Sequence, residues 1–270
     1  MNFNGKVAAI TGAGSGIGRA LAVRLAEEGC SVSLADVDQK GLTQTAAEVA
    51  KLNVGCKQTH LDVRDKKAVG DWADETVQEF GRVDYIFNNA GVTLFDSAAS
   101  TEYDDFEWVM DINFWGMVYG TKSFMKYFQE VKTGHVINVS SLFGLVAFPN
   151  QSAYNASKFA IRGFTEALAL EMKDTDIQVS SVHPGGILTD IARNSRFKET
   201  GSAGVTKEEA VRSFDAIAKT APAQAADVIL KGVLAGKRRI LVGTDAKIID
   251  FLQRLMPVRY ASLLLKVLKP

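Results

Sequence analysis

The sequence predicts an α/β fold in which a parallel β-sheet carries helices on both faces. Short apolar runs alternate with longer segments of helical periodicity, a pattern typical of repeated β-α units. The chain has 270 residues, of which 47% are hydrophobic, enough for one large core. No Pro/Gly/Ser-rich linker and no internal repeat divides the chain, so we expect one domain.

The expected elements follow from the period of the apolar residues. Short apolar runs predict strands at residues 7–10, 31–35, a weaker run leading up to Leu61, 83–87, 135–139, 179–182 and 240–242. Helical periodicity predicts helices at residues 16–28, 42–52, 67–80, 106–128 and 154–172. Residues 188–205 are polar and long for a loop, which suits a mobile lid reaching to about residue 215.

Composition excludes several classes of function. The formal net charge of zero gives no electrostatic footprint for nucleic acid. Cys30 and Cys56 are too few for a disulfide framework and are expected to pack as small hydrophobes. The three histidines, His60, His135 and His183, lack metal-ligand spacing, so we predict no metal. Without a signal peptide or an apolar run of membrane-spanning length, we expect a cytoplasmic protein.

A glycine-rich segment follows the first predicted strand. Its sequence is Thr11-Gly12-Ala13-Gly14-Ser15-Gly16-Ile17-Gly18, and a helical segment begins within it. Such a turn lets backbone N–H groups approach a pyrophosphate at the helix N-terminus. A tight turn without a ligand is the alternative, and the position directly after the first strand favours the phosphate site.

Asp36 ends the second predicted strand, eighteen residues after Gly18. A carboxylate there can accept hydrogen bonds from the adenosine ribose hydroxyls and repel a 2′-phosphate. Val37 follows, where an arginine would favour NADP. We therefore expect NAD rather than NADP, with a helix N-cap as the alternative role of Asp36.

Tyr154 and Lys158 stand four residues apart in a predicted helix, and Ser141 lies thirteen residues before Tyr154. Residues at i and i+4 project from the same helix face. An ammonium close to a phenol favours the phenolate, and a free tyrosine ionises only near pH ~10. The pair could therefore supply a base near neutral pH, with the Ser141 hydroxyl holding a substrate oxygen.

Together these motifs resemble the classical short-chain dehydrogenase/reductase (SDR) family over about residues 5–243. The resemblance implies a Rossmann-type, doubly wound sheet of seven parallel strands in the order 3-2-1-4-5-6-7. It also implies a catalytic tetrad formed by Asn113, Ser141, Tyr154 and Lys158. The expected cofactor-binding residues are Gly12, Ser15, Gly16, Ile17, Gly18, Asp36, Asp62, Val63, Asn89, Ala90, Gly91, Tyr154, Lys158, Pro184, Gly185, Ile187 and Thr189.

The expected reaction is NAD-dependent interconversion of a secondary alcohol and a ketone. Tyr154 would be the acid/base, Lys158 would lower its pKa, and Asn113 would hold a water that relays protons. Apolar residues after Ser141 favour a hydrophobic or bulky substrate, with Ser141, Phe143, Phe148, Tyr154 and Gly186 as the contacts. The alternatives are an NADPH-dependent ketoreductase of the 3-oxoacyl type, which Asp36 disfavours, an enoyl reductase, and a non-catalytic NAD-binding regulator. The basic residues Arg193, Arg196 and Lys198 could meet an anionic substrate, but a solvated face is favoured.

Residues 1–245 are expected to form the cofactor-binding and catalytic domain, and residues 246–270 an amphipathic extension of it. In that extension Pro257 separates two short helices with apolar faces and basic edges. Oligomer packing or closure of the pocket is favoured over contact with a membrane surface. The family resemblance further implies a homodimer or homotetramer built on the helices at residues 106–128 and 154–172.

Overall fold

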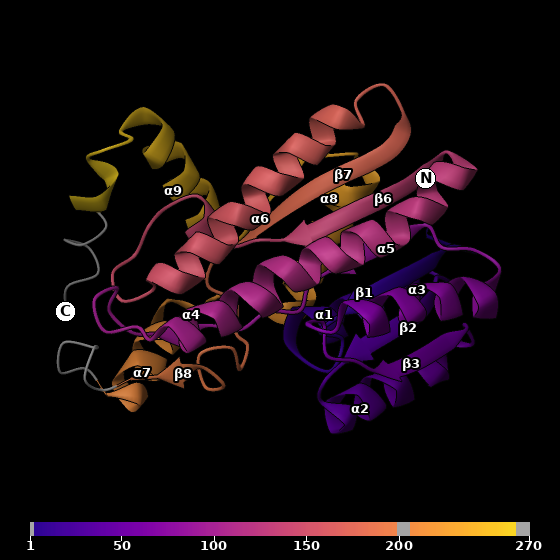
Figure 1. Cartoon of the computed structure of the whole chain (residues 1–270), viewed down its shortest axis with the longest axis horizontal. Helices are drawn as coiled ribbons and strands as arrows, with labels where there is room; N and C mark the ends of the chain where they lie inside the picture. The colour runs from indigo at the N-terminus through magenta and orange to yellow at the C-terminus, as the bar shows by residue number, and fades with distance from the viewer. Residues whose placement is uncertain (1–2, 199–205, 263–270) are drawn as a thin grey trace.

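Seven parallel strands form the central sheet in the order β3-β2-β1-β4-β6-β7-β9 (Figure 1). The computed structural model describes residues 3–198 and 206–262. Because β5 and β8 pair with each other in a separate small sheet, this is the predicted order 3-2-1-4-5-6-7. The strands are β1 Val7–Thr11, β2 Ser31–Asp36, β3 Cys56–His60, β4 Tyr85–Asn88, β5 Leu94–Phe95, β6 Thr133–Val139, β7 Asp176–Pro184, β8 Arg196–Phe197 and β9 Arg239–Val242.

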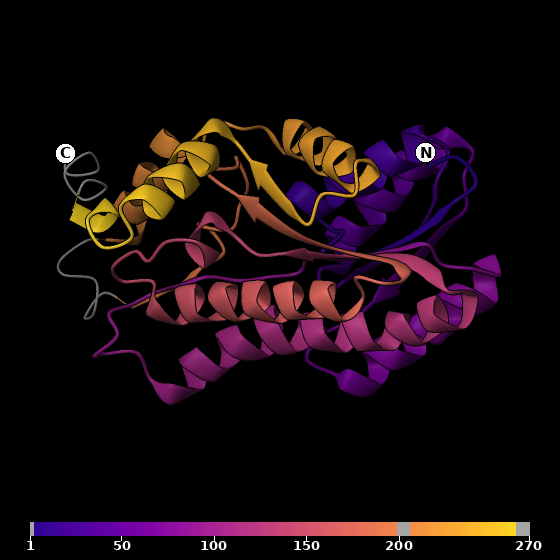
Figure 2. The same cartoon turned by 90° about the horizontal axis from the view of Figure 1, so that it is seen from above.

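Helices cover both faces of the sheet, as Figure 2 shows from above. The core on one face includes side chains from α1, α2 and α8, and the core on the other includes side chains from α3, α5 and α6. The helices are α1 Gly16–Glu27, α2 Gln39–Val49, α3 Lys66–Phe80, α4 Tyr103–Met110, α5 Gly116–Val131, α6 Ser152–Glu171, α7 Lys207–Ile217, α8 Pro222–Leu234 and α9 Thr244–Leu255. The predicted fold class is therefore confirmed.

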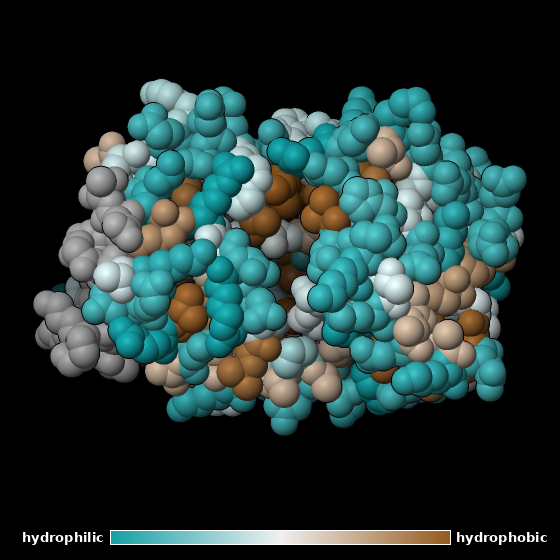
Figure 3. All heavy atoms as spheres, turned by 90° about the horizontal axis from the view of Figure 1, so that it is seen from below, coloured by the Kyte–Doolittle hydropathy of each residue, from teal (hydrophilic) through white to brown (hydrophobic). Residues whose placement is uncertain are grey.

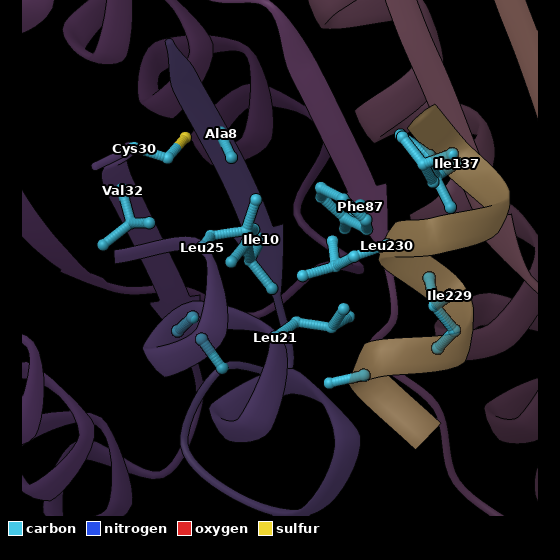
Figure 4. Packing of buried hydrophobic residues seen from close by; sticks show 14 of the residues in the cluster. Ala8, Ile10, Leu21, Leu25, Cys30, Val32, Phe87, Ile137, Ile229 and Leu230 are labelled. Atoms are coloured by element: carbon cyan, nitrogen blue, oxygen red, sulfur yellow. The ribbon is translucent and has the colours of Figure 1, made fainter. Parts of the chain in front are cut away.

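Leu21 and Leu25 of α1 and Leu230 of α8 point toward Ile10 of β1 and Phe87 of β4 (Figure 4). All five side chains are buried, and burying one leucine or isoleucine contributes about 1.5–3 kcal/mol. Central strands are covered on both faces, which explains why their sequences are continuous apolar runs. The edge strand β3 is half exposed and polar, so its sequence signal was weak.

The two cysteines differ in burial. Cys30 is fully buried within the core shown in Figure 4, whereas Cys56 is half-buried at the edge strand β3. The prediction of small packed hydrophobes therefore holds most clearly for Cys30. Both thiols are free.

The predicted helix at residues 106–128 is interrupted by a π turn. Its two parts, α4 and α5, are joined by the turn Asp111–Trp115, which contains the fully buried Asn113. A π turn inserts one extra residue into the helical spiral, which periodicity alone does not reveal.

The predicted lid contains regular structure that its polar sequence did not indicate. Strand β8 pairs with β5, and α7 follows at the end of the lid; residues 199–205 lie outside the described residues. Arg196 donates to Asp105 at 2.7 Å and its guanidinium lies 3.8 Å from the centre of the Trp108 ring. Lys198 also pairs with Asp105, at 3.0 Å. The basic lid residues therefore meet carboxylates of the protein itself.

Helix α9 starts at Thr244, includes the first part of the predicted amphipathic extension and ends before Pro257. Helical structure resumes at Tyr260, and residues 263–270 lie outside the described residues.

The structure also contains helix α8, at a position where the sequence analysis predicts no helix. No helix in the described part of the chain combines the length and apolar character needed to cross a membrane.

Candidate functional site

The glycine-rich loop between β1 and α1 is tied to the end of β4. The Thr11 hydroxyl accepts hydrogen bonds from the backbone N–H groups of Asn89 and Ala90, at 3.0 and 3.1 Å. The Asn89 side chain donates in return to the carbonyls of Thr11 and Gly12. The Asn89 side chain therefore holds the backbone of the loop in position.

Helix α1 begins inside this loop with its first N–H groups uncapped by a side chain. Ser15 is the N-cap residue and makes no side-chain cap hydrogen bond. A side chain at Gly18 would collide with the Gly12 carbonyl and the Asn89 amide, so only glycine fits there. Free N–H groups at a helix N-terminus form a natural site for a phosphate group, and this loop fits a dinucleotide pyrophosphate.

Asp36 lies at the end of β2, next to the glycine-rich loop. Its carboxylate accepts from the backbone N–H of Gly14 at 2.7 Å and from that of Asp38 at 2.9 Å. The side chain remains partly exposed, and Val37 beside it is 62% exposed. A carboxylate oriented in this way could also accept hydrogen bonds from ribose hydroxyls.

Asp62 and Val63, which the family resemblance assigns to the adenine of the cofactor, follow β3. Asp62 forms a forked ion pair with Arg64, whose side chain holds the pKa of that carboxyl below its usual range. Val63 packs so closely on α5 that a side chain at Gly116 would collide with it.

Tyr154 and Lys158 lie one turn apart on α6, and both side chains are buried. Lys158 Nζ is 5.5 Å from the centre of the Tyr154 ring and donates to the Val139 carbonyl at 3.1 Å. The predicted i, i+4 arrangement on one helix face is therefore present.

Burial changes the ionisation of this pair in a way that spacing alone does not predict. It raises the pKa of Tyr154, while a hydrogen bond with the Ser141 side chain acts in the opposite direction. Burial lowers the pKa of Lys158 to about 7, because a buried ammonium loses its hydration. The net effect on Tyr154 is opposite to the predicted lowering of its pKa.

Ser141 follows β6 and caps the short helix η3, Leu142–Gly144. Its hydroxyl accepts from the Phe143 N–H at 3.1 Å. The Ser141 carbonyl lies 3.0 Å from Nδ1 of His183, whose Nε2 meets the Ser181 hydroxyl at 2.8 Å. Burial lowers the pKa of His183 to about 4, so the ring is neutral at pH 7 and holds this loop as a hydrogen-bonding group.

Asn113 brings three parts of the site together. Its amide donates to the Ser157 hydroxyl at 2.9 Å, and its Oδ1 accepts from the Val92 N–H at 2.8 Å. An ideal Cβ at Gly91 would lie 3.2 Å from Asn113 Oδ1 and 3.3 Å from Lys158 Nζ. Gly91 therefore leaves a narrow space in front of Asn113 and Lys158.

Residues 184–189, which the family resemblance assigns to the nicotinamide of the cofactor, run from the end of β7 back to the glycine-rich loop. An ideal Cβ at Gly16 would lie 3.0 Å from the Thr189 methyl carbon. Ile187 forms an isolated bridge with Thr220, between α7 and α8. Gly16 and Thr189, two candidate cofactor residues far apart in the sequence, therefore lie side by side.

Aromatic side chains flank Tyr154 on the candidate substrate side. The rings of Phe143 and Phe148 stack at 5.3 Å and 8°, and Phe143 meets the edge of Tyr154 at 6.0 Å. Both phenylalanines are half-buried, and Leu188 is 47% exposed. Figure 3 shows a hollow near the middle of the underside of the molecule, with hydrophobic residues in its walls.

Sequence reasoning missed several residues that support the site. Asn155 donates to the carbonyls of Phe143 and Val146, and Ser140 donates to the Lys158 carbonyl at 2.8 Å. Asn155 stands next to Tyr154 at a helix start, a position where a polar side chain often bonds to nearby backbone, and that was the available signal. Among the described residues, no group of three His, Cys, Asp or Glu side chains could hold a metal ion.

Known proteins place this arrangement in a family. The family model for short chain dehydrogenases matches residues 6–200. SadH of Mycobacterium tuberculosis, which carries the name of an oxidoreductase, is 45% identical over 97% of this chain and 95% of its own length. Levodione reductase of Leifsonia aquatica is 37% identical over 72% of this chain and 73% of its own.

A solved structure of a short-chain dehydrogenase/reductase from Burkholderia phymatum, in complex with NAD, superimposes with a TM-score of 0.84. It is 27% identical, and the match covers 98% of this chain and 96% of that one. The chain belongs to the short-chain dehydrogenase/reductase family and has its nucleotide-binding, Rossmann-type fold. It is thus a member of a family of oxidoreductases.

Proposed function

We propose that the protein is an NAD-preferring dehydrogenase/reductase that interconverts a hydrophobic or bulky secondary alcohol and the corresponding ketone. The observation that carries the proposal is the position of Tyr154. Its buried ring lies beside Lys158 and Ser141, on the same sheet edge as the uncapped N-terminus of α1. An acid/base group beside a dinucleotide site is the arrangement that hydride transfer to and from an alcohol carbon requires.

In the direction of oxidation, the Tyr154 phenolate accepts the proton of the alcohol hydroxyl as the C–H hydride leaves. Bound NAD supplies the hydride acceptor. The Ser141 hydroxyl donates a hydrogen bond to the substrate oxygen and stabilises the developing carbonyl. When Lys158 is protonated, its charge favours the phenolate, whereas burial of Tyr154 disfavours it.

Asn113 supports this chemistry through the contacts of its side chain. By holding both Val92 and Ser157, it fixes the loop carrying Gly91 in front of Lys158. A relay of protons from Lys158 to solvent through a water near Asn113 stays a prediction from the family resemblance.

Asp36 supports the preference for NAD over NADP. Both carboxylate oxygens are oriented by backbone N–H groups, and Val37 offers no positive charge to a 2′-phosphate. The NADPH-dependent ketoreductase of the 3-oxoacyl type remains the second candidate, and Asp36 disfavours it. A non-catalytic regulatory role is disfavoured by the presence of the full candidate tetrad.

The substrate class rests on the aromatic wall formed by Phe143 and Phe148 beside Tyr154. A stacked pair of rings buries apolar surface of a substrate without offering it a charge. The name of levodione reductase, a relative, fits a ketone or alcohol substrate.

We also propose a homo-oligomer built on α5 and α6. Four large hydrophobic residues are exposed on or next to these helices: Trp115 at 45%, Val131 at 62%, Phe159 at 40% and Leu170 at 61%. A second copy of the chain would cover them.

The test is reduced-nicotinamide absorbance with NAD or NADP and a panel of secondary alcohols, from short aliphatic to steroid-sized. We expect NAD-dependent turnover that Tyr154→Phe lowers by about 10³-fold, with NAD affinity preserved, because the ring remains and only the base is lost. Tyr127→Phe is the matched control, since Tyr127 lies on α5 and bonds to Asp74. Substantial activity in Tyr154→Phe would show that another group is the base.

A further inference from the structure

The segment after β7, residues 184–189, is held at its centre from two sides. Gly186 accepts at its carbonyl from the N–H groups of Lys219 and Thr220, at 3.2 and 3.3 Å. Its own N–H donates to Oδ2 of Asp245 at 2.7 Å, across 59 positions of the sequence. Gly185 N–H donates to the Val242 carbonyl at 2.9 Å. The hydrogen bond to Asp245 differs from the others because its acceptor is a side chain.

Asp245 also limits which residue can stand at position 185, next to Gly186. A Cβ at Gly185 would collide with both carboxylate oxygens and the carboxyl carbon of Asp245. The carboxylate therefore packs directly against the segment and sets its distance from β9.

Asp245 is itself fixed by the packing of α9. It lies in the first turn of that helix, where a carboxylate is favoured by the helix dipole. The next residue, Ala246, is fully buried with Leu142, Leu145 and Val146, in a cluster that Ile249 and Tyr260 also contact. The Tyr260 hydroxyl accepts from the Ala147 N–H at 3.1 Å. Helix α9 is thus anchored on the loop that follows Ser141.

We propose that Asp245 is a positioning residue that holds residues 184–189 in the conformation that receives the nicotinamide end of the cofactor. This role depends on the proposed dehydrogenase function, because it assigns residues 184–189 to the nicotinamide. Through α9, the carboxylate links that segment to the substrate-side loop at residues 142–148. Helix α9 therefore holds parts of the site in position, without itself contacting the reacting atoms.

The experiment compares the binding of NAD with that of ADP-ribose, which lacks the nicotinamide ring, by titration calorimetry of the full-length protein. We expect Asp245→Ala to weaken NAD about tenfold, corresponding to about 1.4 kcal/mol, and to leave ADP-ribose within about twofold. Asp245→Asn should bind NAD nearly as the wild type does, because the amide oxygen can still accept from Gly186.

Asp250→Asn is the matched control on the same helix, since Asp250 pairs with Arg239 and Arg254 rather than with the segment. It should lower the melting temperature and leave the ratio of the two affinities unchanged. If Asp245→Ala does not fold, Asp245→Ser gives the same comparison, because its shorter side chain does not reach Gly186.

Three results would overturn the positioning role. Equal weakening of NAD and ADP-ribose would indicate a general structural effect. Equal weakening of NAD in Asp245→Ala and Asp245→Asn would assign the effect to the charge at the helix N-terminus. No change in either variant, with the wild type binding and turning over NAD, would refute the role of Asp245 alone. A wild type that binds neither ligand would instead refute the proposed function.

Discussion

Lys158 Nζ lies 5.5 Å from the centre of the Tyr154 ring, and both side chains are buried on the same face of α6. Burial disfavours the charged form of each group, so the pKa of Tyr154 rises and that of Lys158 falls to about 7. Lys158 is therefore only partly protonated at neutral pH. This has a measurable consequence for stability.

The free energy of unfolding should contain a contribution from Lys158 that increases between pH 7 and about 10. Above pH 7 the folded lysine is neutral, whereas the unfolded lysine binds a proton up to its ordinary pKa of ~10.4. The unfolded state thus binds more protons, and stability rises with pH. In Lys158→Met this rise is absent. The difference in free energy of unfolding between the two proteins should therefore shift in favour of the wild type as pH increases. Urea unfolding at pH 7, 8, 9 and 10 measures the difference, with the exposed Lys67→Met as control. Parallel plots of unfolding free energy against pH for Lys158→Met and the wild type would contradict the lowered pKa of Lys158.

Acid should destabilise the protein partly through His135. Burial lowers the pKa of its ring to about 4, and the ring hydrogen-bonds to the Ser180 hydroxyl at 2.7 Å. Below pH ~6.5 the unfolded histidine binds a proton that the folded one does not, so this stability is lost as pH falls from 6.5 to 4. By pH 5 the loss should be about 2 kcal/mol.

The measurement is the free energy of unfolding at pH 7.5 and 5 for the wild type and His135→Gln. The variant should lose about 2 kcal/mol less than the wild type on acidification. His60→Gln serves as the control, because His60 is exposed at the end of β3. An equal loss in the wild type and His135→Gln would contradict the prediction.

Asp36→Asn should relax the preference for NAD. The amide oxygen can still accept from Gly14, so the loop keeps its support, while the negative charge that repels a 2′-phosphate is gone. We expect the ratio of kcat/KM for NAD to that for NADP to fall by at least about tenfold, which corresponds to about 1.4 kcal/mol. Asp71→Asn, on the exposed side of α3, should leave this ratio unchanged. An unchanged ratio in Asp36→Asn would show that the carboxylate does not determine the preference for NAD over NADP.

Asp105→Asn should loosen the attachment of β8, which lies within the predicted lid. Asp105 is buried and pairs with both Arg196 and Lys198, so its charge joins α4 to β8. Losing two charge-assisted bonds should cost about 1–3 kcal/mol and expose the lid to protease. Trypsin cleavage near Arg196 and the melting temperature measure the two effects. Asp104→Asn, the exposed neighbour on the same helix, is the control, and equal cleavage of both variants would argue against the anchor.

The Asp105 pairs illustrate what the sequence could not reveal. The strands β5 and β8 are two residues long, too short for any periodicity, and they pair across about a hundred positions. The π turn around Asn113 likewise leaves the helical pattern of its neighbours intact. In the sequence, Arg196 and Lys198 therefore resemble residues of a solvated loop. Only the tertiary structure shows that both pair with the buried Asp105.

By itself, the sequence determined the parallel sheet and the motifs along its carboxyl edge, while its strand order was implied by the family resemblance. These features depend on local chemistry: apolar runs, a glycine-rich turn, and an i, i+4 pair on one helix. The tertiary structure alone decided how these groups are held and charged. Asp245 meets Gly186, and His183 meets Ser141, through contacts between distant segments. Burial, which no spacing reveals, shifts the pKa values of Tyr154 and Lys158, because it depends on every element packed around them.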